Sequence, residues 1–154
     1  MVKRSFREQI KFRKNLINKY DTCIITGIDK ELCDACHIKP YSICKQNEKF
    51  DINNGLLIKK DIHYLFDDYD ITIDCVNLEI IIPDIVLNDR KYRKIRKYNR
   101  KTIFCHQEIT SETKIYLEHH NSLFFAKHKT KNILFDDTKI YTSDMVYSYD
   151  TKYM

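Results

Sequence analysis

The stretch that most constrains this chain runs from residue 31 to residue 68, where two short apolar segments flank a polar loop. The first segment, ELCDACHIKP, ends at Pro40, which lacks the N–H that a longer strand would use. The second, LLIKKDIHYLFDD, begins apolar and then carries apolar residues at helical spacing. We therefore expect two β segments joined by an irregular loop, with the second turning into a helix at about Asp61, a residue that favours the N-cap.

Three polar residues stand out: His37 within the first segment, Asn54 just before the second, and His63 within the second. Asn54 precedes His63 by nine positions, and Asp67 follows His63 by four. On a helix, residues four apart share a face, so His63 and Asp67 can point at one cation. An imidazole and a carboxylate suit a catalytic divalent ion that keeps open positions for water or phosphate.

The text CIITG…DACHIKPYS…DINNGLLIKKDIHYLFDD resembles the HNH endonucleases, also called ββα-metal or His-Me finger nucleases, over about residues 22–74. More narrowly, it is similar to a subgroup with an Ala-His-Ile-x-Pro first motif and an Asn-Gly-Leu-Leu…His-x-Leu-Phe-Asp second motif. The resemblance implies hydrolysis of phosphodiester bonds in nucleic acid, DNA before RNA, with Mg²⁺ or Mn²⁺ as the divalent ion. A single site of this kind cuts one strand at a time, so cutting both strands needs a homodimer or sequential nicks.

The resemblance also implies a role for each polar residue. His37 corresponds to the general base, which suits an imidazole because its pKa lies near neutrality. Asn54 corresponds to the residue that holds the loop and helps orient the base, and His63 with Asp67 to the metal ligands. Cys36 departs from the pattern, because many HNH nucleases have an Asp or His ligand there and the subgroup has alanine. A thiol is a poor ligand for Mg²⁺ and a better one for zinc.

The cysteines allow a competing interpretation, half of a structural zinc site formed by Cys23, Cys33, Cys36 and Cys44. Only one closely spaced pair exists, whereas such sites use two, so we expect reduced thiols that are bystanders rather than structural Zn²⁺. Asp34 lies an odd number of positions from His37. In a strand this puts it on the opposite face, so it is a minor candidate.

Charge is concentrated in two blocks. Residues 1–20 carry seven Lys/Arg and one acid, residues 89–101 carry eight and one, and residues 21–88 carry six and thirteen. Dense basic blocks favour phosphate contact and steering toward a polyanion, although solvated helix faces have the same composition. The candidate nucleic-acid contacts are Arg90, Lys91, Arg93, Lys94, Arg96, Lys97, Arg100 and Lys101. Tyrosines between these cations could stack on bases or pack, and the segment could be a helix or an extended arm.

The remaining elements follow from periodicity and turn residues. SFREQIKFRKNLINKY predicts a helix with one apolar face, which comprises Phe6, Ile10, Leu16, Ile17 and Tyr20. CIITG predicts a short strand entering a turn, Gly55 a tight turn, and YDITIDCVNLEIIIP a hairpin. A helix over 111–126 is expected, with Thr110 or Ser111 at its N-cap. Leu117, His120 and Phe124 share one face of this helix. Pairs such as His119 and His120 occur on solvated helices, and neither histidine is assigned a role.

The predicted fold is α+β: a ββα-metal core with an N-terminal basic helix and C-terminal strand and helix additions. We expect a single domain over residues 1–154, in which 130–154 is an extension. No apolar run has the length of a membrane helix, and no signal peptide is recognised, so a cytoplasmic or nuclear protein is expected. Abundant Ile, Lys, Asn and Tyr, with AT-rich codons, hint at a viral or phage genome.

Two alternatives to the nuclease stay open on sequence. The first is a non-catalytic nucleic-acid-binding module that keeps the HNH fold, which is motivated by Cys36 and by the few identifiable metal ligands. The second is a small zinc-ribbon interaction protein.

Overall fold

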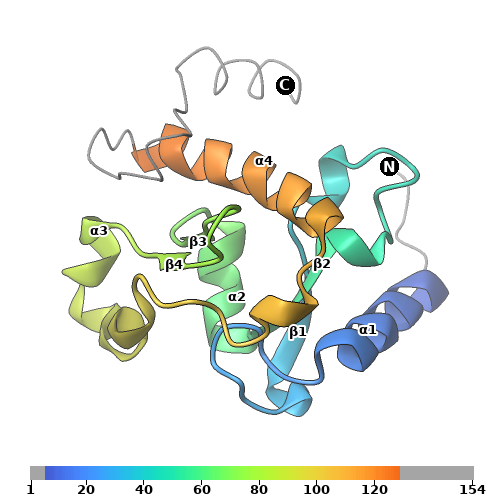
Figure 1. The fold of residues 1–154 in the computed structure, drawn as a ribbon, viewed down its shortest axis with the longest axis horizontal. Helices are drawn as coiled ribbons and strands as arrows, with labels where there is room; N and C mark the ends of the chain where they lie inside the picture. The colour runs from blue at the N-terminus through green and yellow to red at the C-terminus, as the bar shows by residue number, and fades with distance from the viewer. Residues whose placement is uncertain (1–5, 129–154) are drawn as a thin grey trace.

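The structure is a computed structural model that describes residues 6–128. Helices and small antiparallel sheets alternate along the chain (Figure 1), so the fold is α+β, as predicted. The α-helices and strands are α1 (Phe6–Tyr20), β1 (Cys33–His37), β2 (Gly55–Lys59), α2 (Lys60–Asp67), β3 (Thr72–Ile73), β4 (Ile80–Ile81), α3 (Asp84–Leu87) and α4 (Ser111–His128). The 3₁₀ helices are η1 (Lys30–Leu32), η2 (Tyr41–Ile43), η3 (Ile52–Asn54), η4 (Arg90–Tyr98) and η5 (His106–Glu108).

The centre of the molecule is a ββα unit, as predicted. β1 pairs with β2 in antiparallel register, with His37 opposite Gly55 and Cys33 opposite Lys59. α2 follows β2 without a loop, and both helices α1 and α2 pack on the hairpin (Figure 1). Lys59, not Asp61, occupies the N-cap of α2. Asp61 lies two residues after the N-cap, in the first turn, where its carboxylate interacts favourably with the positive end of the helix.

α1 forms as predicted, but its buried face is different. Phe12, Leu16 and Tyr20 are buried at four-residue intervals, whereas Phe6 and Ile10 are 81% and 53% exposed. The predicted face was therefore wrong at its N-terminal end, because the stripe that meets the hairpin runs through Phe12 rather than Ile10.

Gly55 is required by close packing rather than by a turn. Its φ of −133° is ordinary extended backbone. A Cβ at this position would lie 2.6 Å from Phe12 Cζ and 2.8 Å from the Leu16 methyl carbons. The absence of a side chain therefore lets α1 press against the start of β2.

The predicted strand in CIITG is a turn instead. Ile24 to Thr26 form the turn, closed by an isolated bridge between Thr22 and Asp29, and Gly27 has a φ of +78°. These residues are apolar because they are buried in the core, not because they pair in a sheet. The Cys23 sulfur accepts backbone N–H groups from Ile25, Thr26 and Lys59, which ties the turn to the end of β2.

The C-terminal additions cover the other side of α2. The predicted hairpin exists as β3 and β4, and the predicted helix as α4, which packs on β3. Thr110 supplies the N-cap, because its hydroxyl accepts the Thr113 N–H at 3.1 Å. Asn121 donates from its side-chain amide to the Thr72 hydroxyl and the Ile73 carbonyl, both at 2.8 Å, which fixes α4 on β3.

The basic segment is helical. η4 consists of two 3₁₀ segments that meet at a kink at Tyr92, and the side chains of Tyr92, Ile95 and Tyr98 pack against the core. These side chains are only partly buried, so packing accounts for part of the surface of the tyrosines.

Two expectations reach beyond the described part of the chain. The extension over 130–154 lies outside the described residues, so the single domain over residues 1–154 stays a prediction. Within residues 6–128, no helix combines the length and the apolar character needed to cross a membrane.

Candidate active site

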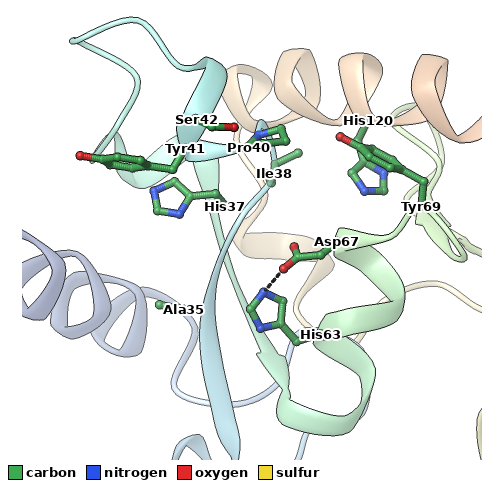
Figure 2. Close-up of a pocket in the computed structure, with 10 residues that line it drawn as sticks. All are labelled: Ala35, His37, Ile38, Pro40, Tyr41, Ser42, His63, Asp67, Tyr69 and His120. Atoms are coloured by element: carbon green, nitrogen blue, oxygen red, sulfur yellow. Dashed lines mark ion pairs between the residues drawn. The ribbon is translucent and has the colours of Figure 1, made fainter. Parts of the chain in front are cut away.

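A pocket of about 280 Å³ opens where β1, the end of α2 and α4 meet (Figure 2). Its lining comprises Ala35, His37, Ile38, Pro40, Tyr41, Ser42, His63, Asp67, Tyr69 and His120. Three of the four predicted site residues, His37, His63 and Asp67, therefore lie around one cavity. Asn54 does not line it and is buried beneath the adjoining loop.

His63 and Asp67 lie side by side on α2, as their spacing predicts. His63 Nε2 lies 3.0 Å from Asp67 Oδ2. The Cys36 sulfur joins them at 3.6 Å from Asp67 Oδ1, and one donor atom from each of the three residues lies within 4.8 Å of the others. Cys36 was expected to be a bystander, but the structure places it in this cluster. Imidazole, carboxylate and thiol together could hold a metal ion.

Asp34 contacts His63 on the side of the ring away from Asp67. Its Oδ2 lies 3.1 Å from His63 Nδ1, so both ring nitrogens of His63 face carboxylates. The hydrogen bond with Asp67, and after it that with Asp34, raises the pKa of His63 above its ordinary value despite burial. A carboxylate that holds the outer nitrogen of a histidine is the arrangement that orients metal-binding imidazoles.

Cys36 is fully buried, unlike its two partners. Burial first, and the neighbouring Asp67 carboxylate second, raise the pKa of the Cys36 thiol well above its ordinary value. The Asp67 side chain is 51% exposed, so the cluster is closed on the strand side and open on the helix side.

His37 occupies the opposite face of β1. Figure 2 shows its ring and Ala35 on the α1 side, whereas His63 and Asp67 lie on the α2 side. The ring stacks on Phe12 at 4.6 Å between centroids, and Nε2 lies 2.7 Å from the Lys49 carbonyl oxygen. Because a carbonyl only accepts, Nε2 carries the proton in the neutral ring. Nδ1 is then the nitrogen with the lone pair.

Asn54 connects the two ends of the loop between β1 and β2. Its Oδ1 accepts the Lys39 N–H at 2.8 Å, and its Nδ2 donates to the carbonyls of Lys39 at 3.2 Å and Glu48 at 3.3 Å. Glu48 also pairs with the Lys39 ammonium at 2.8 Å, and both side chains are largely buried. The loop that supplies the Lys49 carbonyl to His37 is therefore fixed from within.

Comparison with known families relates part of the chain to a known group. Residues 23–74, about a third of the sequence, match the family model HNH_2, described as HNH endonuclease. This segment is similar to the HNH endonucleases. A comparison with curated proteins finds no match. The HNH match includes β1, β2, α2 and β3, leaves α1, η4 and α4 outside, and indicates nuclease activity in general. The narrower motif subgroup stays a prediction.

Sequence reasoning missed the histidine that supports the HNH core from α4. The helical pattern placed His120 on one face with Leu117 and Phe124 but gave it no role. It is buried, with its ring stacked on Phe66 at 3.8 Å. Its Nε2 donates to the Phe66 carbonyl at 2.8 Å, and its Nδ1 accepts from the Thr72 hydroxyl at 2.7 Å. Burial lowers the pKa of His120 to about 3. His119 is buried as well. The pattern carried no signal for these contacts, because the covering elements are distant in sequence.

The four cysteines of the competing zinc interpretation form no common cluster among the described residues. Cys36 contacts Asp67, whereas Cys44 lies 3.3 Å from the Asn54 amide. The eight candidate cations of residues 90–101 are all exposed and project from η4 and the turn after it. Arg93, Lys94 and Lys97 line a second hollow of about 370 Å³, together with residues from the start of α2.

Proposed function

We propose that this protein is a metal-dependent HNH nuclease that hydrolyses phosphodiester bonds, with DNA as its preferred substrate. The observation that supports it most is that His37, His63 and Asp67 line the same pocket. A general base and a pair of metal-ligand side chains are the two components that such hydrolysis needs within reach of one phosphate.

The donor set fits a divalent ion. His63 and Asp67 would hold it, and the exposed side of Asp67 leaves room for water and a phosphate oxygen. When bound, the ion supplies charge that neutralises the scissile phosphate and stabilises the leaving 3′ oxygen.

His37 acts as the general base in this proposal. The Lys49 carbonyl and the Phe12 ring fix the orientation of the imidazole, so Nδ1 is the atom that takes the proton from water. Asn54 acts as a positioning residue, because it holds the loop that carries Lys49.

The basic residues of η4 and the following turn would contact the phosphate backbone. All eight are exposed, and three of them line the hollow shared with the start of α2. Contacts of this kind provide affinity that depends on salt and carry no sequence information.

The test is nicking of a supercoiled plasmid with Mg²⁺, Mn²⁺, Co²⁺ or Zn²⁺, each with and without chelator. We expect metal-dependent conversion to open circles by the wild type and its loss in His37→Ala. His106→Ala is the matched control, because His106 is exposed and does not line the pocket.

Absence of metal-dependent nicking, or full activity of His37→Ala, would overturn the proposal. If the inactive wild type still bound DNA in a salt-sensitive manner, the chain would be a binding module instead. A parallel assay with single-stranded RNA decides between the two nucleic acids.

A further inference from the structure

Cys36 has a position that simple packing does not explain. It lies opposite Leu56 in the hairpin register, and its side chain has no exposed surface. Buried thiols commonly pack as small apolar groups. The Cys36 sulfur instead faces the Asp67 carboxylate, at 3.6 Å, beside the imidazole of His63.

The three donors differ in hardness from the set that Mg²⁺ prefers. Mg²⁺ takes six oxygen ligands in an octahedron and usually keeps several waters. A thiolate, an imidazole and one carboxylate oxygen form a mixed sulfur, nitrogen and oxygen set, which suits a borderline ion such as Zn²⁺ or Co²⁺. Three protein ligands leave a fourth position open, which is the pattern of a catalytic rather than a structural site.

The surroundings also favour a preorganised site. Asp34 holds the outer nitrogen of His63 at 3.1 Å, which directs the other nitrogen toward Asp67 and Cys36. Strand alternation puts Asp34 and Cys36 on the same face of β1, so the strand contributes both a ligand and the group that orients a second ligand.

We propose that Cys36 is the third protein ligand of the divalent ion, and that the site therefore binds Zn²⁺ or Co²⁺ in preference to Mg²⁺. The inference deepens the proposed nuclease function by naming the class of ion. On ligation the thiol loses its proton to the solvent and the sulfur binds as thiolate.

Cobalt absorbance tests this inference without any measurement of activity. The metal-stripped full chain is titrated with Co²⁺, and we expect visible bands of low coordination number together with a near-ultraviolet sulfur-to-cobalt charge-transfer band. Cys36→Ser should lose the charge-transfer band and bind Co²⁺ at least about tenfold more weakly, the lower bound for losing even an outer partner of a metal ligand.

Cys33→Ser is the matched control, because Cys33 is also buried in β1 but its sulfur contacts the Asp29 carbonyl instead. This variant should keep the band. Cys36→Asp supplies a hard ligand at the same position, so we expect the ratio of Mn²⁺ to Co²⁺ affinity to rise. Circular dichroism reports whether each variant is folded.

Three outcomes would overturn the inference. One is a charge-transfer band that persists in folded Cys36→Ser, and another is Co²⁺ binding by the wild type with no such band. The third is failure of the wild type to bind Co²⁺ at all. Each leaves the proposed nuclease function intact if plasmid nicking with Mg²⁺ still depends on His37, so the two proposals fail separately.

Discussion

The two faces of strand β1 provide different chemical environments. On the α1 face, the His37 imidazole stacks on the Phe12 ring and its Nε2 lies at the Lys49 carbonyl, so aromatic and backbone groups hold the ring. On the α2 face, Asp34 and Cys36 meet His63 and Asp67, so that face is anionic and rich in metal-ligand atoms.

This separation shows how neighbouring residues can serve incompatible needs. A general base must stay neutral enough to accept a proton, whereas a metal site needs negative charge and several donors. Cys36 and His37 are adjacent, yet strand alternation points them into different environments. A shift of the β1–β2 register by one residue would exchange the two faces.

The largest expected effect is on the nicking rate, and Co²⁺ affinity then distinguishes His37 from His63. His37→Ala should lower the nicking rate by about 10²–10⁴-fold, the usual contribution of a general base, and leave Co²⁺ affinity unchanged. His63→Ala should lose both nicking and Co²⁺ binding, since it removes a ligand. Nicking rates and cobalt titrations of the same preparations provide the comparison.

A loss of Co²⁺ affinity in His37→Ala would mean that the two faces act as one site. The difference between the faces would then have no functional meaning.

Part of this arrangement could be predicted from the sequence. The spacing of His63 and Asp67 put them on one helical face, and the order of two β segments and a helix was correct. Both are local properties, set by helix and strand periodicity. The prediction that Asp34 lies on the face of its strand opposite to that of His37 was also correct.

Whether Asp34 binds metal stays a prediction. Its carboxylate contacts His63 on the side of β1 where α2 packs, a contact that the spacing alone did not indicate. Which face a helix covers depends on tertiary packing, and so do the burial of His120 under β3 and the need for glycine at Gly55. No local pattern carries that information.

The second prediction concerns the pH dependence of stability and His120, the buried histidine of α4 that stacks on Phe66 of α2. Burial holds the pKa of His120 at about 3 in the folded chain, against 6.5 for an ordinary histidine. Between these values the unfolded chain binds a proton here that the folded chain does not, so stability falls as the pH decreases. Each pH unit should remove about 1.4 kcal/mol of unfolding free energy, or about 3 kcal/mol from pH 6 to pH 4.

Urea denaturation across this range, compared with His120→Gln, isolates the contribution. The glutamine variant does not titrate and should show a shallower dependence, while His63 contributes equally to both proteins. Parallel curves for the two proteins would show that His120 is not the proton acceptor that unfolding exposes.

The third prediction tests the carboxylate that orients His63. Asp34→Asn should weaken Co²⁺ binding by about 10–100-fold, because the charge behind the imidazole is lost. At saturating metal the nicking rate should change far less, since His37 is untouched. Asp61→Asn is the matched control, because Asp61 lies on α2, like His63, but its carboxylate pairs with Lys59 instead. Equal losses in both variants would indicate a general charge effect.

The smallest effect is expected on the α1 face. Phe12→Leu removes the ring that stacks on His37, an aromatic contact worth about 0.5–1.5 kcal/mol, so stability and nicking should both fall modestly. Co²⁺ affinity should not change. Phe6→Leu, on the same helix but 81% exposed, should alter none of the three. If Phe12→Leu weakened Co²⁺ binding as much as Asp34→Asn does, β1 would transmit packing changes between its faces, and the base and the metal site would be coupled rather than separate.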